Sequence, residues 1–245
     1  MSVACKWNWH NSGHQVWYDD ITFETLQSTY PLQFYDDFTG TAGGSVFGAT
    51  QTWNTVDVGA ATEAIVADSS NGLFRLHIHV TGEDEDAVLF MGDNRQFSVD
   101  HGLIFETKLD MATLPTLGTR ALVGMSGDNA ADKDTITESA WFKWSGSGAI
   151  LIETDDTTLE NTNVATGVTS VAGTPNIFRI DFTTLANVKF FIDGVRVAGG
   201  TTFNMSNLAA AELILQPIFS MDKANPNAGL GDMDIDYVRL MSNRS

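Results

Sequence analysis

The sequence predicts an all-β fold in which two antiparallel sheets pack face to face as a β-sandwich. Apolar and polar residues alternate in many short segments, as in strands that bury one face. Gly, Asn, Asp or Ser separates these segments at intervals of about ten residues, which is typical of sandwich folds. No window carries the apolar spacing of an amphipathic helix, so helices are expected to contribute little.

The clearest strands lie in Phe178–Val197, FRIDFTTLANVKFFIDGVRV. Apolar residues occupy every second position on both sides of the short loop Thr183–Asn187, so each segment has one apolar face. The pair Asp193-Gly194 then interrupts the alternation, and Asp-Gly is a strong hairpin signal because a type I′ turn needs positive φ at both central residues. Three consecutive antiparallel strands are therefore expected here.

Similar alternation predicts the other strands of the sandwich. The last of them changes its apolar face between Tyr237 and Val238, which a β-bulge or coverage of both faces by the N-terminal residues would explain. We favour coverage, because residues 1–33 need a surface to lie on. The expected strands are Phe34–Phe38, Phe74–Val80, Ala87–Met91, Leu103–Asp110, Arg120–Met125, Ala140–Trp144, Ala149–Glu153, Leu213–Phe219 and Met233–Leu240.

The chain divides into an N-terminal extension, residues 1–33, and one sandwich domain, residues 34–245. The extension is rich in aromatic residues but has no sustained periodicity. It forms either an edge strand with loops that close the sandwich or an arm that anchors the protein to a partner, since Trp and Tyr dominate interface hot spots. The anchoring interpretation assigns partner contacts to Trp7, Trp9, Trp17 and Tyr18.

Acidic residues dominate the charge of the chain: 31 acidic residues stand against 13 basic ones, a net charge of −18. Such a surface repels phosphate backbones, which argues against direct nucleic-acid binding. Cys5 is the only cysteine, so no disulfide can form within the chain. There is no signal-peptide apolar core near the start and no apolar run of about 20 residues that could span a membrane. We therefore expect a soluble protein made in a cytoplasm.

Two acidic segments and one histidine pair carry candidate chemistry. The loop Gly127–Glu138 is expected to be solvated, and its spacing does not follow the calcium-loop pattern. The turn Gly82–Asp86 is likewise expected to be solvated, with ordinary carboxyl pKa values. His77 and His79 lie two residues apart on a predicted strand and therefore share one face. We interpret that face as a polar outer sheet surface, with a glycan or partner surface as the alternative.

Several segments occur in an order that resembles the concanavalin A-like lectin/glucanase jelly rolls, LamG-like domains among them. They are FYDDF, NGLFRLHI, HGLIFETKLDM, FRIDF followed by VKFFIDGVRV, and DIDYVRL, and the resemblance spans Phe34–Leu240. With AWFKW and a strand that ends in ETDD, the sequence looks most like virion proteins of tailed bacteriophages, where such domains decorate heads. The resemblance implies a jelly roll, a fold that enzymes, lectins and structural proteins share, so individual sites must decide the function.

The resemblance also says where catalytic carboxylates would stand. Glucanases of this kind place a nucleophile and an acid/base on one strand, in the pattern E-x-D-x-x-E, with the two carboxylates about 5–5.5 Å apart. The matching strand here is Ser139–Ser145, SAWFKWS, which holds no carboxylate. No other catalytic motif occurs, so we expect no catalytic residues and no enzyme activity.

A structural calcium ion is a further implication of the resemblance. Many jelly rolls of this kind hold one where the first and last strands meet, bound by a carboxylate of the last strand and by backbone carbonyls. Matched residue by residue, the carboxylate is Asp236 and the carbonyl donors are Asp37 and Gly72. Calcium takes 6–8 oxygen ligands, so Asp36 or water would supply the rest.

The sequence therefore predicts a non-enzymatic bacteriophage virion protein that decorates or cements the capsid exterior. Its partners would be the major capsid protein or other virion proteins, and it would act as a homo-oligomer or in many copies. The alternative is a carbohydrate-binding, lectin-like module for adhesion to host-surface glycans. Such a module needs aromatic rings on which a sugar can stack, and the candidates are Trp141 and Trp53.

Overall fold

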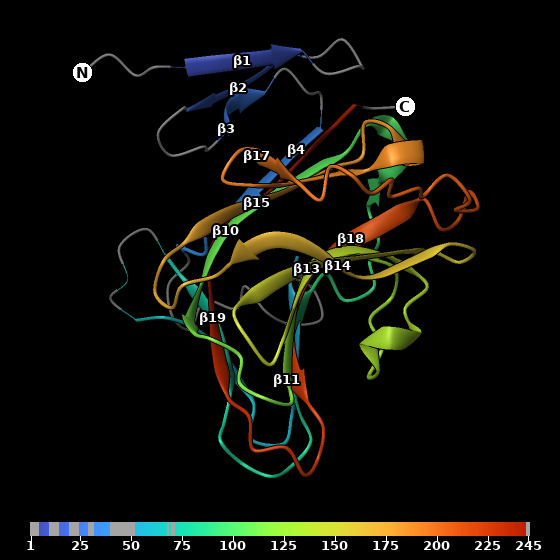
Figure 1. Cartoon of the computed structure of the whole chain (residues 1–245). Helices are drawn as coiled ribbons and strands as arrows, with labels where there is room; N and C mark the ends of the chain where they lie inside the picture. Colours follow the sequence, from blue (N-terminus) through green and yellow to red (C-terminus); the bar gives the residue numbers. More distant parts are fainter. Residues whose placement is uncertain are drawn as a thin grey trace.

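The computed structural model describes residues 5–9, 15–19, 25–28, 32–39, 52–67, 69 and 72–243 of the chain. Two antiparallel sheets lie against each other and form the sandwich that the sequence predicts (Figure 1). Short 3-10 helices are the only helical elements among these residues: η1 (Val99–His101), η2 (Lys133–Thr135) and η3 (Leu185–Asn187).

One sheet of the sandwich, which we call the back sheet, has the strand order β17-β16-β15-β10-β19-β7-β6, and β4 also pairs with β19. The long strand β19 lies at its centre and pairs with β10 and β7. The strands are β4 (Leu32–Asp36), β6 (Thr62–Ile65), β7 (Phe74–Ile78), β10 (Ile104–Thr113), β15 (Asn176–Asp181), β16 (Lys189–Ile192), β17 (Val195–Val197) and β19 (Gly231–Ser242).

The other sheet, the front sheet, has the order β14-β13-β12-β11-β18-β8-β5, and β9 also pairs with β18. Its central strands β8, β18, β11 and β12 are almost entirely buried, which means that both faces are covered there. The strands are β5 (Asn54–Val58), β8 (Glu85–Phe90), β9 (Phe97–Ser98), β11 (Thr119–Ser126), β12 (Glu138–Ser145), β13 (Ala149–Asp156), β14 (Glu160–Thr169) and β18 (Ile214–Lys223).

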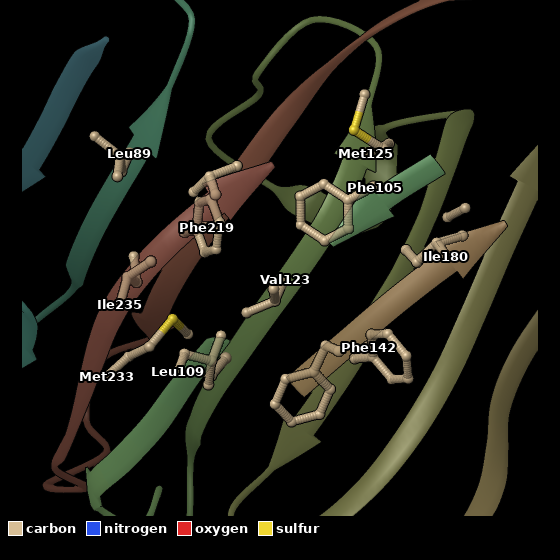
Figure 2. Close-up of a cluster of buried hydrophobic side chains, with 14 of the residues drawn as sticks. Leu89, Phe105, Leu109, Val123, Met125, Phe142, Ile180, Phe219, Met233 and Ile235 are labelled. Carbon is tan, nitrogen blue, oxygen red and sulfur yellow. The ribbon is translucent and has the colours of Figure 1, made fainter. Parts of the chain in front are cut away.

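The main hydrophobic core fills the space between the two sheets. Figure 2 shows Phe219 and Phe142 of the front sheet facing Phe105 and Ile180 of the back sheet. Phe142 meets Phe178 edge to face, with ring centroids 5.0 Å apart. Burial of each such side chain contributes about 1.5–3 kcal/mol, so this layer dominates the stability of the domain.

The three-stranded segment predicted from Phe178–Val197 is confirmed as β15, β16 and β17. Asp193 and Gly194 adopt φ values of +49° and +74°, as the Asp-Gly signal requires. Alternation and turn chemistry agree here, which explains why the prediction succeeds.

The change of face in the last strand has a different cause from the one we favoured. The pairing of β19 with β10 shifts register between Ile235 and Tyr237, so a β-bulge places one extra residue in β19. Ile235 before the bulge and Val238 after it both lie in the main core. The bulge therefore accounts for the switch, and coverage by the N-terminal residues is not needed to explain it.

Four strands of the sandwich escaped the sequence-based prediction: β5, β6, β14 and the two-residue strand β9. β5 and β6 are short, and β14 reads ENTNVATGVT, with few apolar residues. In β14 exposed and half-buried positions alternate without a fully buried one, as expected for the edge strand of a sheet. Backbone hydrogen bonds to the neighbouring strand hold such a strand in place. Its sequence therefore shows little alternation of apolar and polar residues.

The N-terminal residues contribute a three-stranded antiparallel sheet of their own, β1 (Cys5–Trp9), β2 (Gln15–Asp19) and β3 (Thr25–Ser28). The following strand, β4, begins at Leu32 and pairs with β19 in the back sheet. The strands β1–β3 thus pair with one another and β4 with the back sheet, and the division of the chain into residues 1–33 and 34–245 stays a prediction.

Candidate functional site

A pocket of about 550 Å³ opens over the outward face of the front sheet, at the ends of β8, β11 and β18. Carboxylates make up much of its wall, whereas Arg120 and Lys223 are the two cationic residues that line it. The volume lies within the range of small-molecule sites in proteins. The lining residues are Val58, Asp84, Glu85, Asp86, Gly118, Arg120, Ala131, Asp132, Asp134, Asp222, Lys223, Ala224 and Asn227.

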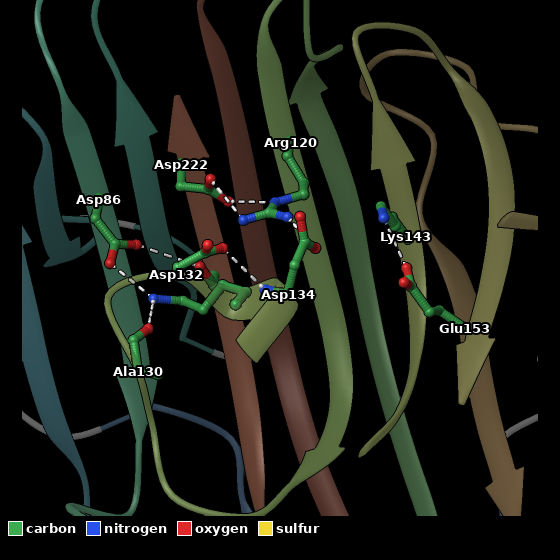
Figure 3. Close-up of polar contacts among 10 residues, drawn as sticks. Asp86, Arg120, Ala130, Asp132, Asp134, Lys143, Glu153 and Asp222 are labelled. Atoms are coloured by element: carbon green, nitrogen blue, oxygen red, sulfur yellow. Dashed lines mark hydrogen bonds and ion pairs between the residues drawn. The ribbon is translucent and has the colours of Figure 1, made fainter. Parts of the chain in front are cut away.

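The floor of the pocket is a row of residues on neighbouring strands. Asp86 of β8 lies opposite Asp222 of β18, which lies opposite Arg120 of β11. The Nε and Nη2 atoms of Arg120 donate to the two carboxylate oxygens of Asp222 at 2.9 and 3.0 Å, and Nη1 donates to Asp134 (Figure 3). Burial opposes the charge of Arg120, but the hydrogen bonds and charge of Asp222 outweigh it and raise the pKa of the guanidinium. Arg120 is thus fixed and fully engaged.

The wall of the pocket is the acidic loop Gly127–Glu138, which does not have the solvated form that its composition predicts. Its single lysine, Lys133, is completely buried. The Nζ atom donates to Asp86 Oδ2 at 2.7 Å and to the carbonyl of Ala130 at 2.8 Å. The loop therefore folds down onto the sheet, where Lys133 meets the Asp86 carboxylate.

Beneath the loop lies a second, smaller apolar cluster, separate from the main core. Ile136 and Ala130 of the loop cover side chains that point outward from the front sheet. This layer explains why the central strands of that sheet are buried on both faces. Its sheet members are Val88, Phe90, Leu122, Trp141 and Ile218, with Val56 at the side.

Burial raises the pKa of the Asp86 carboxyl, and the nearby charge of Asp222 pushes it in the same direction. Lys133 opposes both effects through its charge and its hydrogen bond. The charge of the Asp86 carboxylate is therefore opposed by burial and supported by Lys133.

The acidic turn Gly82–Asp86 needs a correction, because its last two residues begin β8 and are buried. Glu85 Oε1 lies 3.0 Å from Nζ of Lys223, and both side chains are fully buried. Lys223 also donates to the carbonyls of Thr81 and Gly229, so this ion pair ties two loops to the sheet. The expectation of solvated side chains with ordinary pKa values is wrong for Glu85 and Asp86.

The strand that would carry catalytic carboxylates in a glucanase is β12, which begins at Glu138, one residue before the matched segment Ser139–Ser145. The strand therefore does hold one carboxylate, at its first residue, contrary to the expectation of none. Trp141 belongs to the cluster under the loop, and Lys143 pairs with Glu153 of β13 at 2.7 Å. A cation and an indole thus occupy outward positions of this strand.

The two tryptophans proposed for sugar stacking are both buried. Trp53 is 0% exposed in the main core, and its Nε1 donates to Asp36 Oδ2 at 2.8 Å. Trp141 is 2% exposed beneath the loop, and its Nε1 has no hydrogen-bond partner among the described residues. Neither ring offers an open face to a sugar in this structure.

The three residues expected to bind calcium come from segments that meet. Asp37 and Gly72 touch, since a Cβ on Gly72 would stand 2.3 Å from the Asp37 carbonyl oxygen. Asp236 lies at the bulge of β19, between the positions that pair with β4 and β7. Its carboxylate, however, pairs with Nζ of Lys108 at 2.9 Å. An ammonium group therefore neutralises the one side-chain ligand among these three residues. The Asp36 carboxylate, the other candidate, accepts from Trp53 Nε1 and the Phe38 N–H, so the set fits calcium poorly.

Within the described residues no three His, Cys, Asp or Glu side chains gather closely enough to hold a metal ion. No helix in this part of the chain has the length and apolar character needed to cross a membrane.

The four residues assigned to partner contacts lie on β1 and β2. Trp7 pairs with Trp17 across these strands, and Tyr18 pairs with Lys6. Trp9, at the end of β1, pairs with Gln15. The side chains lie outside the described part of the chain, so the partner assignment stays a prediction.

Sequence reasoning missed the charged groups that build the pocket. Arg120 and Asp222 are 102 residues apart, and the strand register that joins them cannot be read from composition. One signal was present: Lys133 is the only basic residue in the segment GDNAADKDTITE. A lone cation among acids that folds inward is a natural partner for a buried carboxylate.

No protein-family model and no curated protein sequence matches this chain. Solved structures do share its arrangement. A protein of unknown function from Shewanella oneidensis MR-1 superposes with a TM-score of 0.57 at 14% identity, covering 91% of this chain and 93% of that one.

Two other solved structures are similar and concern carbohydrates. One has a TM-score of 0.56 and 12% identity, over 86% of this chain and 99% of that one. It comes from work on endo-acting O-glycanases, which prominent members of the human gut microbiota express to initiate mucin breakdown. The other, the carbohydrate recognition domain of Emp47p, has a TM-score of 0.53 and 7% identity over 86% and 95%. At such identities the likeness shows the fold alone: this chain is a sandwich of two antiparallel sheets with a lectin-like jelly-roll fold.

Proposed function

We propose that this chain is a carbohydrate-binding module that takes a sugar into the pocket over β8, β11 and β18. The observation that carries the proposal is the pocket itself: about 550 Å³ on an outward sheet face, walled by polar side chains that ion pairs hold in place. The fold agrees, since similar jelly rolls include the carbohydrate recognition domain of Emp47p.

The chemistry of the wall suits sugar hydroxyls. A hydroxyl both donates and accepts, so it pairs well with carboxylates, which accept, and with an amide such as Asn227, which does both. Asp134 and Asp132 belong to the loop that forms one side, and Asn227 belongs to the lining as well. Because the floor is fixed by the Arg120–Asp222 pair, a bound sugar would order few side chains, which favours affinity.

The charge of the pocket selects among sugars. Six carboxylates line it, and both cations are already engaged: Arg120 with Asp222 and Asp134, Lys223 with Glu85. No cation is left to receive a sulfate or a carboxylate of a ligand, and the excess negative charge repels such groups. Neutral sugars and amino sugars are therefore the favoured ligands.

We propose binding without hydrolysis. A retaining or inverting glycosidase needs one carboxyl group protonated and a second one free to act as nucleophile or base. Four of the six carboxylates that line the pocket are paired with a lysine or arginine, namely Glu85, Asp86, Asp134 and Asp222. The other two, Asp84 and Asp132, each accept a backbone N–H. Incubation with neutral and mucin-type O-glycans should release no reducing sugar, and measurable release would contradict this part of the proposal.

Calorimetric titration with a panel of neutral, amino and sulfated oligosaccharides tests the binding function. Asp134→Asn, in the pocket wall, should weaken binding of the best neutral ligand roughly tenfold, the loss of one charged hydrogen bond. Asp128→Asn is the matched control, since Asp128 lies in the same loop outside the lining and pairs with Arg95. Absence of binding to every neutral and amino sugar would overturn the proposal, as would equal effects of the two variants.

A second candidate is decoration of a bacteriophage capsid exterior, with the major capsid protein or other virion proteins as partners. Two observations favour it. The strands β1–β3 form a separate sheet in which Trp7 lies opposite Trp17, and the whole chain has a net charge of −18. Aromatic anchors suit a protein interface, and like charge keeps crowded copies apart. A protein of this kind would be made in the host cytoplasm and work in many copies or as a homo-oligomer.

Copy number tests this candidate. Quantitative mass spectrometry of purified particles should find the chain in hundreds of copies on the capsid, whereas a glycan-binding adhesin would occur in a few copies per particle or outside particles. Trp7→Ala with Trp17→Ala should release the full chain from capsids while leaving sugar titrations unchanged. Retention of the double variant on capsids would argue against the aromatic anchor.

A further inference from the structure

His77 of β7 and His79, one residue past the end of that strand, form an imidazole pair. The strand expected to run to Val80 ends at Ile78, yet the two rings, two residues apart, still lie on one side of the chain and meet. The ring centroids are 4.1 Å apart and the rings are nearly perpendicular. The side chains are 33% and 39% exposed, so both rings are open to solvent.

The two imidazoles differ at Nδ1. His77 Nδ1 contacts Oδ1 of Asp232, a carboxylate that also accepts from Thr113 Oγ1. His79 Nδ1 lies 3.8 Å from Oε2 of Glu85 and makes no hydrogen bond among the described residues, while the backbone N–H of His79 donates to that oxygen at 2.7 Å. In His77, the hydrogen bond from Nδ1 to the carboxylate leaves Nε2 as the nitrogen that can bind a metal ion.

We propose that His77 and His79 chelate one divalent late first-row transition ion, such as Cu²⁺ or Zn²⁺, through their Nε2 atoms. Metal-ligating histidines almost always give their other nitrogen to a carboxylate or carbonyl, the arrangement present here at His77. A metal ion about 2.0–2.1 Å from each nitrogen needs the two donors roughly 3 Å apart, so chelation requires the adjacent rings to turn their Nε2 atoms toward one point. Water completes the coordination, because the described residues contain no cluster of three side-chain ligands.

The surroundings favour a cation at this place. Two cations lie nearby, and both are paired. Arg75 donates to both carboxylate oxygens of Asp234 at 2.6 Å. Lys223 Nζ, which donates to the carbonyl of His79, lies 3.0 Å from Glu85 Oε1. Asp232 adds negative charge beside His77. A hollow of about 420 Å³ lined by His77, Asp232 and Arg75 gives an ion access from solvent to the His77 side of the pair. Nitrogen donors select copper, nickel or zinc over calcium and magnesium.

Cu²⁺ and Zn²⁺ titrations of the untagged full chain test the site, followed by calorimetry and, for copper, by electron paramagnetic resonance. We expect one equivalent of Cu²⁺ with coupling to two nitrogens, and tighter binding of Cu²⁺ than of Zn²⁺. His77→Asn and His79→Asn should each weaken binding at least tenfold. Asp232→Asn, which keeps both ligands, should weaken it roughly 10–100-fold through the hydrogen bond to Nδ1.

The chain has five histidines, which allows matched controls. His101→Asn removes an imidazole at η1 that faces Asp100, and it should bind metal as the wild type does. His10→Asn with His14→Asn tests the N-terminal histidines, and this variant should also bind normally. Unchanged affinity in His77→Asn and His79→Asn, with all variants folded by thermal melting, would overturn the proposal. So would loss of binding in the N-terminal double variant.

Discussion

The two outward faces of the sandwich hold their charges in different ways. On the front sheet the loop Gly127–Glu138 covers the face, and Lys133 lies fully buried against Asp86. On the back sheet the pair Lys108–Asp236 is 29% and 24% exposed. A buried pair fixes the geometry around it and is costly to break, whereas an exposed pair contributes little. The buried ion pair thus fixes the loop on the front face, whereas the ion pair on the back face stays in contact with solvent.

Removal of the buried cation, Lys133, should have the largest effect on the difference between the two faces. Lys133→Ala leaves Asp86 in a buried site without its partner and removes the aliphatic stem that the loop packs on the sheet. We expect the free energy of unfolding to fall by about 3–5 kcal/mol, the usual cost of an uncompensated buried charge. Lys108→Ala on the back sheet should cost about 1 kcal/mol or less. Urea denaturation of the three proteins measures both values.

Two further variants separate charge from packing. Lys133→Met keeps the length of the stem and should remain strongly destabilising, because Asp86 stays unpaired. Lys133→Met combined with Asp86→Leu removes both charges and should recover most of the loss, as replacement of a buried pair by apolar groups often does. If Lys133→Ala costs no more than Lys108→Ala, the loop is not anchored as described.

The pH dependence of stability distinguishes two neighbouring carboxylates of β8. Burial pushes the pKa of Glu85 upward, but hydrogen bonds from Thr81, the His79 N–H and Lys223 outweigh it and lower the pKa. A carboxyl group with a lowered folded pKa stabilises above its unfolded pKa of about 4.3, and that contribution disappears as the pH falls. Glu85→Gln should therefore cost about 1–3 kcal/mol at pH 7 and progressively less below about pH 4.3.

The contribution of Asp86 to stability should change with pH in the direction opposite to that of Glu85, because burial raises the pKa of Asp86. The folded protein then binds a proton at Asp86 at a higher pH than the unfolded chain does. The contribution of Asp86 to stability consequently becomes more favourable as the pH falls through the raised pKa. Urea titrations of Glu85→Gln and Asp86→Asn against wild type, from pH 7 to pH 3.5, should give differences that change in opposite directions. If the two stability differences changed with pH in the same direction, the opposite pKa shifts of Glu85 and Asp86 would be contradicted.

Much of the sandwich could be predicted because its strands bury one face and end at turn residues. Phe178–Val197 is the clearest case, since alternation and Asp193-Gly194 point to the same structure. β14 could not be found, because an edge strand that buries no side chain fully carries no apolar alternation. The bulge in β19 was among the alternatives, but the choice depended on how the neighbouring strand β10 is aligned.

The candidate site could be predicted far less well than the fold. Its groups come from three strands and a loop, and only the register places Asp86, Asp222 and Arg120 in one row. Composition suggested a solvated loop for Gly127–Glu138, because acidic residues outnumber its single lysine. The lysine nonetheless determines where the loop lies, since one buried ion pair outweighs many solvated carboxylates.

The smallest expected effect concerns calcium. In wild type the ammonium of Lys108 lies 2.9 Å from Asp236 Oδ2 and provides the positive charge that calcium would bring. Addition of Ca²⁺ to metal-free protein should therefore leave the melting temperature unchanged, whereas Zn²⁺ should raise it through His77 and His79, and His77→Asn should remove that rise. Lys108→Met leaves the Asp236 carboxylate without its ammonium, and only this variant should gain stability from Ca²⁺. A calcium-dependent melting temperature in wild type would show instead that Asp236, Asp37 and Gly72 bind the ion despite the lysine.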